Sequence, residues 1–192
     1  EYRRQRQMCI RDSVITFTTL LSAFLLPLLG AYADLRHDKH KLMGKLAFVG
    51  AIAASLMFFV TDSAWVLGSV LLIIGNLALG ASLVVYDAIL IDISTPDERD
   101  RVSSQGWAWG YVGGGLLLIA NLALYLGTDL GALAIRISLL SAGLWWGAWT
   151  LVPYLKIKHT ADKPLSEIKF SALASGSFKQ LNRTLRELAR YP

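Results

Sequence analysis

Five long runs of apolar residues alternate with short polar segments along the chain. Each run can cross the roughly 30 Å hydrocarbon core of a bilayer as a helix, which needs about 20 residues. The runs are rich in Leu, Ala and Gly and are apolar on all sides, unlike the alternating strands of a membrane barrel. The pattern therefore predicts an all-α, polytopic transmembrane bundle with helices at residues 14–33, 42–60, 64–93, 106–126 and 132–154.

Composition supports a multi-pass integral membrane protein. Hydrophobic residues make up 54% of the chain and charged residues 17%, whereas about a quarter of the residues in a soluble domain are charged. No stretch of the sequence has the composition of a separate soluble domain.

Basic residues gather in alternate connections between the apolar runs. The connections at 61–63 and 127–131 contain no Lys or Arg. Because Lys and Arg are retained on the cytoplasmic side, the basic segments should be cytoplasmic. We take the net charge of +5 to reflect contact with anionic membrane lipids, and we expect no nucleic-acid partner. The basic residues are Arg36, Lys39, Lys41, Lys45, Arg99, Arg101 and those from Lys156 onward.

The two ends of the chain differ from the apolar middle. Residues 1–13 would lie outside the cell although they contain several Arg residues, and Gln7 to Ser13 resembles translated adapter sequence. We therefore expect residues 1–13 to be non-native or disordered. They hold the only cysteine, Cys9, so the sequence supports neither a disulfide nor a cysteine-based metal site.

Residues 155–192 are predicted to form a cytoplasmic interdomain loop with an amphipathic basic helix. Phe178, Leu181, Leu185 and Leu188 recur at helical spacing among Lys and Arg residues in this segment. Such a helix would lie against anionic lipid head groups.

The loop after the first run carries Gly30, Asp34 and Arg36, followed by further basic residues. Gly30 would allow close approach of a neighbouring helix. The arrangement resembles the loop signature of the major facilitator superfamily, although the internal Gly of that signature is absent here.

The third and fourth runs extend this resemblance. Tyr86-Asp87 precedes Asp92-Ile93, a Thr-Pro-Asp-Glu-Arg turn at 95–99, and a helix rich in Gly and Trp from Gly106. This order resembles the autophagy-type vacuole effluxer branch of the superfamily. The resemblance implies that the chain covers helices two to six of twelve and the loop between the two halves. It also implies secondary transport of a small metabolite, with amino-acid efflux suggested by the eukaryotic members of the family.

By the same resemblance, Gly30, Asp34, Arg36, Arg99 and Arg101 belong to a cytoplasmic latch that breaks and remakes during transport. We expect Asp34 to pair with Arg99 or Arg101. The alternative is a set of independent, solvated charges.

Five polar residues are candidates for a coupling or substrate pathway. Asp87 is either a protonatable coupling group or an interfacial structural carboxylate, and Asp92 is expected to be an interfacial or loop-pairing residue. Arg136 either extends its guanidinium to the outer interface, contacts an anionic substrate or forms an interhelical ion pair. For Asn76 and Asn121, packing between helices is the alternative to ligand binding.

The fourth run combines Gly106, Gly110, Gly113 and Gly114. Small residues at these intervals predict close helix packing. The spacing also resembles the antiporter signature of the superfamily, but Tyr111 occupies the position of its Pro.

Two other classes of function remain open from the sequence. One is a membrane-embedded enzyme that uses acidic residues at the cytoplasmic face, and the other is a nontransporting receptor or scaffold. Against the enzyme, the acids are interleaved with Arg residues, and the sequence predicts no metal site and no cofactor. We expect a full-length monomer in the bacterial inner membrane, with proton coupling and a small-molecule substrate.

Overall fold

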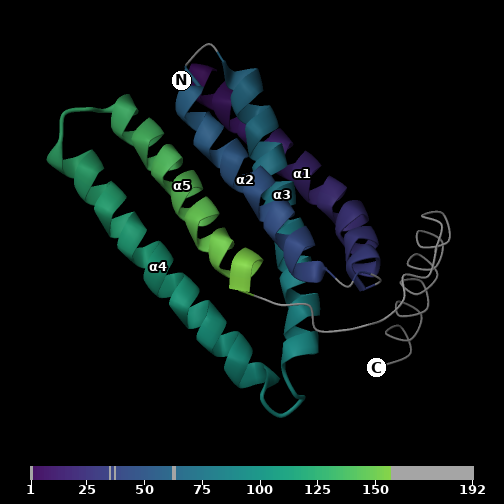
Figure 1. Ribbon diagram of the computed structural model, residues 1–192. Helices are drawn as coiled ribbons and strands as arrows, with labels where there is room; N and C mark the ends of the chain where they lie inside the picture. The colour runs from purple at the N-terminus through teal and green to yellow at the C-terminus, as the bar shows by residue number, and fades with distance from the viewer. Residues whose placement is uncertain (1, 35, 37, 62–63, 157–192) are drawn as a thin grey trace, which may run out of the picture.

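The computed structural model describes residues 2–34, 36, 38–61 and 64–156, with side chains from residue 8 onward. In chain order the elements are α1 (Tyr2–Asp34), α2 (Lys39–Leu56), the short 3-10 helix η1 (Met57–Phe59), α3 (Trp65–Ile93), α4 (Arg99–Gly127) and α5 (Ala132–Lys156). Each of the five long helices is long and apolar enough to cross a membrane. The predicted all-α bundle of five spans is therefore confirmed (Figure 1).

Helices α1 and α4 begin well before the positions that the apolar pattern predicts. The first starts at Tyr2 instead of residue 14, so residues 2–13, expected to be non-native or disordered, continue the helix. They contain no Gly or Pro, and Arg and Gln favour helix. Their native origin stays a prediction, and the amphipathic helix predicted within 155–192 lies outside the described residues.

The other early start is that of α4, at Arg99 instead of residue 106. Pro is favoured in the first turn of a helix, where its missing N–H is not needed, and Pro96 stands three residues before Arg99. The Thr95 hydroxyl donates to a Glu98 carboxylate oxygen at 3.2 Å, and the Arg99 N–H donates to the Thr95 carbonyl at 3.0 Å. These bonds start a helix while the sequence is still polar, before its apolar part begins.

The helices form an arc in the order α4, α5, α2, α3, α1 (Figure 1). The central helix α2 packs along both α3 and α5, whereas α1 packs mainly on α3. A small core of Ala33, Met43, Val85 and Ile89 joins α1, α2 and α3. By contrast, α4 touches its neighbours lightly and has no buried residue.

Glycines bring α2 and α5 into close contact. Gly44 lies against the Tyr154 ring and Gly50 against the Trp146 ring. Gly143 of α5 faces the backbone of α2, and a Cβ there would stand 2.6 Å from the Ser55 nitrogen. Close packing of this pair of helices was not predicted from the sequence.

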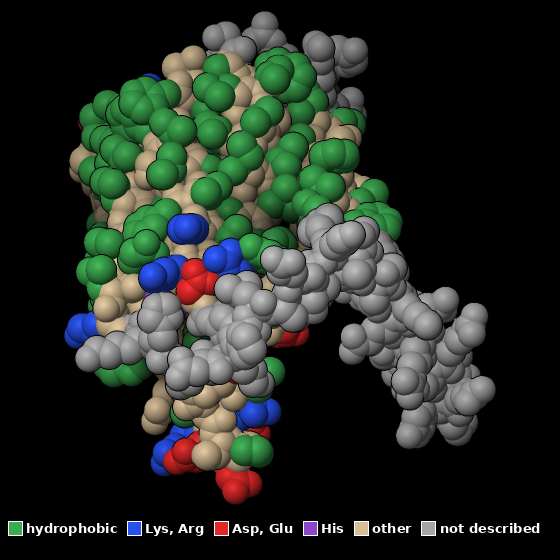
Figure 2. All heavy atoms as spheres, turned by 45° about the vertical axis from the view of Figure 1, so that its right-hand side comes forward, with side chains coloured by type: hydrophobic (Ala, Val, Ile, Leu, Met, Phe, Trp, Pro, Cys, Tyr) green, Lys and Arg blue, Asp and Glu red, His purple; other side chains and the backbone are tan. Residues whose placement is uncertain are grey.

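Charged side chains gather at one end of the bundle. The end at which α1, α3 and α5 finish and α2 and α4 begin is called the basic end below. Figure 2 shows hydrophobic side chains over most of the visible face, with Lys, Arg, Asp and Glu toward its lower end. A belt of apolar surface above a charged end is the distribution expected of a membrane protein.

Candidate functional site

An ion pair joins two helices at the basic end. The Lys39 ammonium, at the start of α2, lies 2.8 Å from a carboxylate oxygen of Asp92, near the end of α3. The Lys39 side chain is 14% exposed and that of Asp92 is 46% exposed. Asp92, expected to be an interfacial or loop-pairing residue, thus pairs with the first residue of α2, directly after the connection between α1 and α2.

A second cluster lies beside this pair. The Arg36 guanidinium donates two hydrogen bonds to the carboxylate of Asp38, at 2.7 and 3.1 Å, and a third to the Tyr32 hydroxyl. The hydrogen bond from Arg36 lowers the pKa of Asp38, against the opposing effect of partial burial. The same bond raises the pKa of Arg36. The hydrogen bonds of Arg36 with Asp38 and Tyr32 therefore stabilise one conformation of the connection between α1 and α2.

The expected pairing of Asp34 is not present in this arrangement. Asp34 is exposed at the end of α1, and the ion pairs of the described residues do not include it. Arg101 instead donates to Glu98 of its own turn at 3.1 Å. Arg99 is half-buried, and its Nε is buried without a hydrogen-bond partner in the described part of the chain. The hydrogen bond from Arg101 to Glu98 at the start of α4 thus competes with the expected pairing of Arg101 with Asp34.

Gly30 marks a close approach between α1 and α3. A Cβ at this position would stand 3.3 Å from a methyl group of Val84. The remaining predicted latch residue therefore faces a packed helix instead of solvent, and its role in gating stays a prediction.

Besides Asp92, two polar candidates lie on α3, and both are exposed. Asn76 donates from Nδ2 to the Leu72 carbonyl at 3.0 Å. Asp87 is exposed, and no hydrogen bond or ion pair to it is found within the described ranges. No group of three or more His, Cys, Asp or Glu residues in the same ranges could hold a metal ion.

Arg136 is used inside the protein. Its Nε donates to the Phe58 carbonyl in η1, and its guanidinium lies over the Phe58 ring at 4.8 Å from the ring centre. It therefore fastens the short helix after α2 to the start of α5. This contact, with a backbone carbonyl and an aromatic ring, is none of the three alternatives that the sequence left open for Arg136.

Asn121 joins two helices. The Ser141 hydroxyl of α5 donates to its Oδ1 at 3.0 Å. This hydrogen bond is one of few ties between α4 and the rest of the bundle. It favours the packing interpretation of Asn121 over ligand binding.

The glycine series of α4 is mostly uncovered. A Cβ at Gly106 would stand 2.7 Å from the Tyr86 hydroxyl oxygen, and one at Gly113 would stand 3.8 Å from Trp145. Gly110 and Gly114 have nothing within 4 Å of such a Cβ among the described residues. The predicted close packing of this face is thus present only at Gly106, near the basic end.

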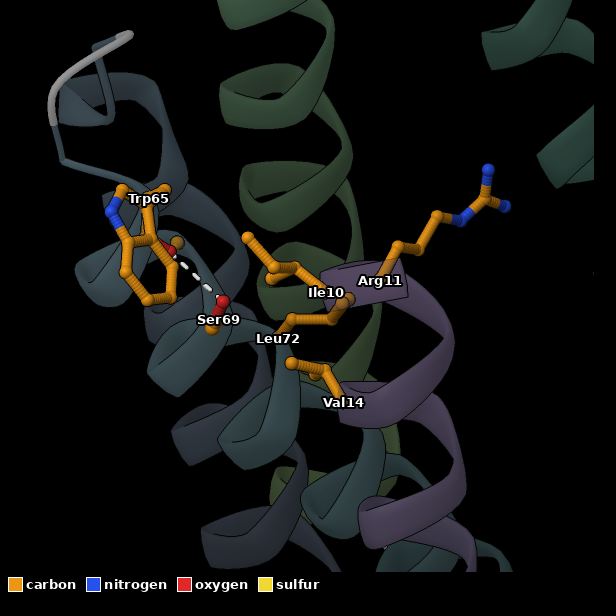
Figure 3. A pocket seen from close by; sticks show the side chains of 7 residues that line it. Ile10, Arg11, Val14, Trp65, Ser69 and Leu72 are labelled. Atoms are coloured by element: carbon orange, nitrogen blue, oxygen red, sulfur yellow. Dashed lines mark hydrogen bonds between the residues drawn. The ribbon is translucent and has the colours of Figure 1, made fainter. Parts of the chain in front are cut away.

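A polar groove between α1 and α3 was not predicted from the sequence. Hydroxyl residues Thr18, Thr19 and Ser22 line it, and Asn76 faces it from α3. Their spacing places all three hydroxyls on one side of an otherwise apolar helix, and this signal could have been found in the sequence. Above the groove, Ile10, Val14 and Leu72 form a neighbouring apolar pocket (Figure 3).

A family model described as "Vacuole effluxer Atg22 like" matches residues 13–192. The chain belongs to this family. The match covers α1 from residue 13 and all of the four later long helices, and it confirms the resemblance to the vacuole effluxer branch that the sequence indicated.

Relatives of the chain include bacterial and fungal proteins. An uncharacterized MFS-type transporter, YxiO of Bacillus subtilis (strain 168), is 26% identical over 92% of this chain and 42% of the relative. Autophagy-related protein 22-1 of Phaeosphaeria nodorum is 24% identical over 81% of this chain and 35% of the relative. The chain spans less than half the length of these relatives. No solved structure matches the chain.

The chain is thus similar to MFS-type transporters over most of its helical part, and its five long helices support an integral membrane protein. The Lys39–Asp92 pair, the exposed Asp87 and the polar groove are features of part of a member of this family.

Proposed function

We propose that the full-length protein is a secondary active transporter that moves an amino acid across the bacterial inner membrane by alternating access. The observation that carries this proposal is the family match over residues 13–192, which include most of the first candidate membrane span and all of the other four. Breakable ion pairs at the basic end support it, because alternating access requires contacts that form in one state and open in the other.

Asp87 is the proposed proton-coupling residue. It is exposed on α3 and has no partner in the described part of the chain. A carboxylate within a membrane span costs about 2.5 to 3.5 kcal/mol on insertion scales, so its presence is typical of a cavity or proton path. The partners in this proposal are the proton, the amino acid and the surrounding lipids, and the transporter works as a monomer without nucleic acid.

Reconstitution of the full-length protein tests this function. Proteoliposomes with an imposed pH gradient should accumulate one or more labelled amino acids, whereas protein-free vesicles should not. Failure to move any amino acid, from a preparation that is monodisperse and has a cooperative thermal transition, would reject the proposed substrate class.

The coupling role of Asp87 is tested separately with Asp87→Asn. The variant should lose accumulation driven by the pH gradient but retain exchange of labelled for unlabelled substrate, since exchange needs no net proton movement. Asp129→Asn, in the exposed turn between α4 and α5, serves as the matched control. Undiminished accumulation by Asp87→Asn would rule out the coupling role while leaving transport itself intact.

A further inference from the structure

The polar groove between α1 and α3 has the size of a small-solute site. Its volume is about 420 Å³, and Arg11, Ile15 and Leu72 complete its lining. Thr18 is buried, Ser22 is half-buried, and Thr19 and Asn76 are exposed.

These polar groups lie deep within the spans. At a rise of about 1.5 Å per residue, Ser22 stands about 18 Å from the end of α1 at Asp34, and Asn76 about 17 Å from the start of α3 at Trp65. Both positions fall inside a hydrocarbon layer of about 30 Å. Polar side chains at such depth usually face a cavity, partner or solute path instead of lipid.

The hydrogen bonds in the groove leave mainly acceptors free. The Thr18 hydroxyl donates to the Val14 carbonyl at 2.7 Å, and the Thr19 hydroxyl donates to the Ile15 carbonyl at 2.9 Å. A hydroxyl has one hydrogen and two lone pairs, so both threonine oxygens can still accept. Ser22 adds a further hydroxyl oxygen.

Asn76 contributes a further free hydrogen-bond acceptor to the groove. One of its amide hydrogens is bound to the Leu72 carbonyl, and its Oδ1 remains as an acceptor. Four oxygens on two facing helices thus surround a volume in which only one amide hydrogen and one hydroxyl hydrogen are uncommitted. An ammonium group, with three donors and no acceptor, suits this site, whereas a carboxylate does not.

Arg11 is the charged residue on the groove lining. It is exposed, and Figure 3 shows its side chain directed away from Ile10 and Leu72. It also belongs to residues 1–13, which we expect to be non-native or disordered. The proposed ammonium site therefore excludes Arg11.

We propose that this groove binds the ammonium group of the transported solute, through Thr18, Thr19, Ser22 and Asn76. The proposal rests on the proposed transport function and adds the chemical group that this part of the path recognises.

Two competitors that each keep one end of leucine separate ammonium from carboxylate recognition. Isoamylamine keeps the ammonium, and isocaproate keeps the carboxylate. Binding of each is measured by thermal shift on the purified full-length protein, and inhibition of leucine uptake is measured in proteoliposomes.

Asn76→Leu should raise the dissociation constant of isoamylamine about ten-fold, as expected for loss of a hydrogen bond to a charged group, and leave that of isocaproate unchanged. Thr19→Val, which is nearly isosteric, should act in the same direction and guards against misfolding of the first variant. Thr16→Val on the same helix and Ser69→Ala in the neighbouring apolar pocket are matched controls that should change neither constant.

The outcomes of these measurements distinguish the proposed ammonium site from the proposed transport function. Failure of the wild type to bind isoamylamine, or an equal loss of both competitors in Asn76→Leu and Thr19→Val, overturns the ammonium site. Leucine uptake that is insensitive to both variants overturns it too and leaves the transport function standing. Isoamylamine binding that depends on Asn76 in a protein that carries no amino acid supports the groove and rejects the proposed substrate class.

Discussion

At the scale of single residues, the Lys39–Asp92 pair links the ends of two helices without adding much to stability. The pair is partly exposed, and such pairs contribute under about 1 kcal/mol. Its value therefore lies in favouring one arrangement of α2 and α3 over another. A contact of this strength can break in a transport cycle.

Charge reversal tests this link. Lys39→Glu and Asp92→Lys should each lower the transport rate and slightly lower the melting temperature of the full-length protein, because each places like charges together. The double variant should recover both, since the pair is rebuilt with exchanged signs. Asp129→Lys, in the exposed turn between α4 and α5, is the charge-reversal control and should leave transport unchanged. A double variant no better than the sum of its singles would contradict the link.

The Arg36–Asp38 contact predicts a measurable titration. The hydrogen bond from Arg36 lowers the pKa of Asp38, so its contribution to stability is present above the ordinary carboxyl pKa and is lost as pH falls through the lowered value. Carbon-13 NMR of labelled Asp in the full-length protein should place the Asp38 midpoint below the usual range. Arg36→Gln should move the pKa back up, whereas Arg101→Gln should not. An unchanged midpoint in Arg36→Gln would show that another group sets this pKa.

Residue types were easier to predict from the sequence than their partners. The pattern identified Asp92, Arg101 and Arg136 as polar residues worth attention, but Arg101 bonds to Glu98 and Arg136 to a backbone carbonyl. These partners depend on where α4 begins and where η1 turns. The bond from Arg101 to Glu98 is local and forms at little entropic expense, so it competes with the long-range pair that the family resemblance suggests. The bond from Arg136 to Phe58 joins distant parts of the chain and depends on how α5 packs beside η1.

At the scale of helices, the contact between α2 and α5 depends on glycine. A Cβ at Gly143 would stand 2.6 Å from the Ser55 nitrogen and 2.7 Å from the Ala51 carbonyl oxygen, both atoms of helix backbone. Backbone atoms cannot rotate away as a side chain can. Gly143→Ala must therefore push the two helices apart.

We expect Gly143→Ala to destabilise the full-length protein by about 1 to 3 kcal/mol, the usual effect of overpacking. Gly110→Ala is the matched control, because the described residues leave open space around it. Melting temperatures in detergent compare the two variants. Equal melting temperatures would mean that α2 and α5 cross less closely than described.

The five long helices could be predicted from the sequence, whereas the contacts between them could not. Five apolar runs long enough for a bilayer predicted five spans, and the structure has them. The glycine series of α4 was the clearest packing signal, yet the closest crossing lies between α2 and α5 around Gly50 and Gly143. Glycine permits close approach, but the neighbouring helices decide which glycines are used.

At the scale of the whole molecule, many large apolar side chains remain exposed on the surface of the bundle. On α4, Leu118 and Ile119 are each 67% exposed and Leu126 is 72% exposed. Exposed apolar surface on this scale needs lipid or further protein to cover it. The charged residues at the basic end then fix which end of the bundle faces the cytoplasm.

Cysteine labelling tests that orientation in the full-length protein. In a Cys9→Ser background, single cysteines at the exposed Lys41 and Asp97 report on the basic end, and cysteines at the exposed Thr61 and Asp129 report on the other end. A membrane-impermeant maleimide should label positions 61 and 129 on intact cells, and positions 41 and 97 only after permeabilisation. The reason is that Lys and Arg beside the spans resist transfer across the membrane, whereas the connection with Asp129 contains neither. Labelling of positions 41 and 61 from the same side would mean that α2 does not cross the bilayer, and the five-span arrangement would then be wrong.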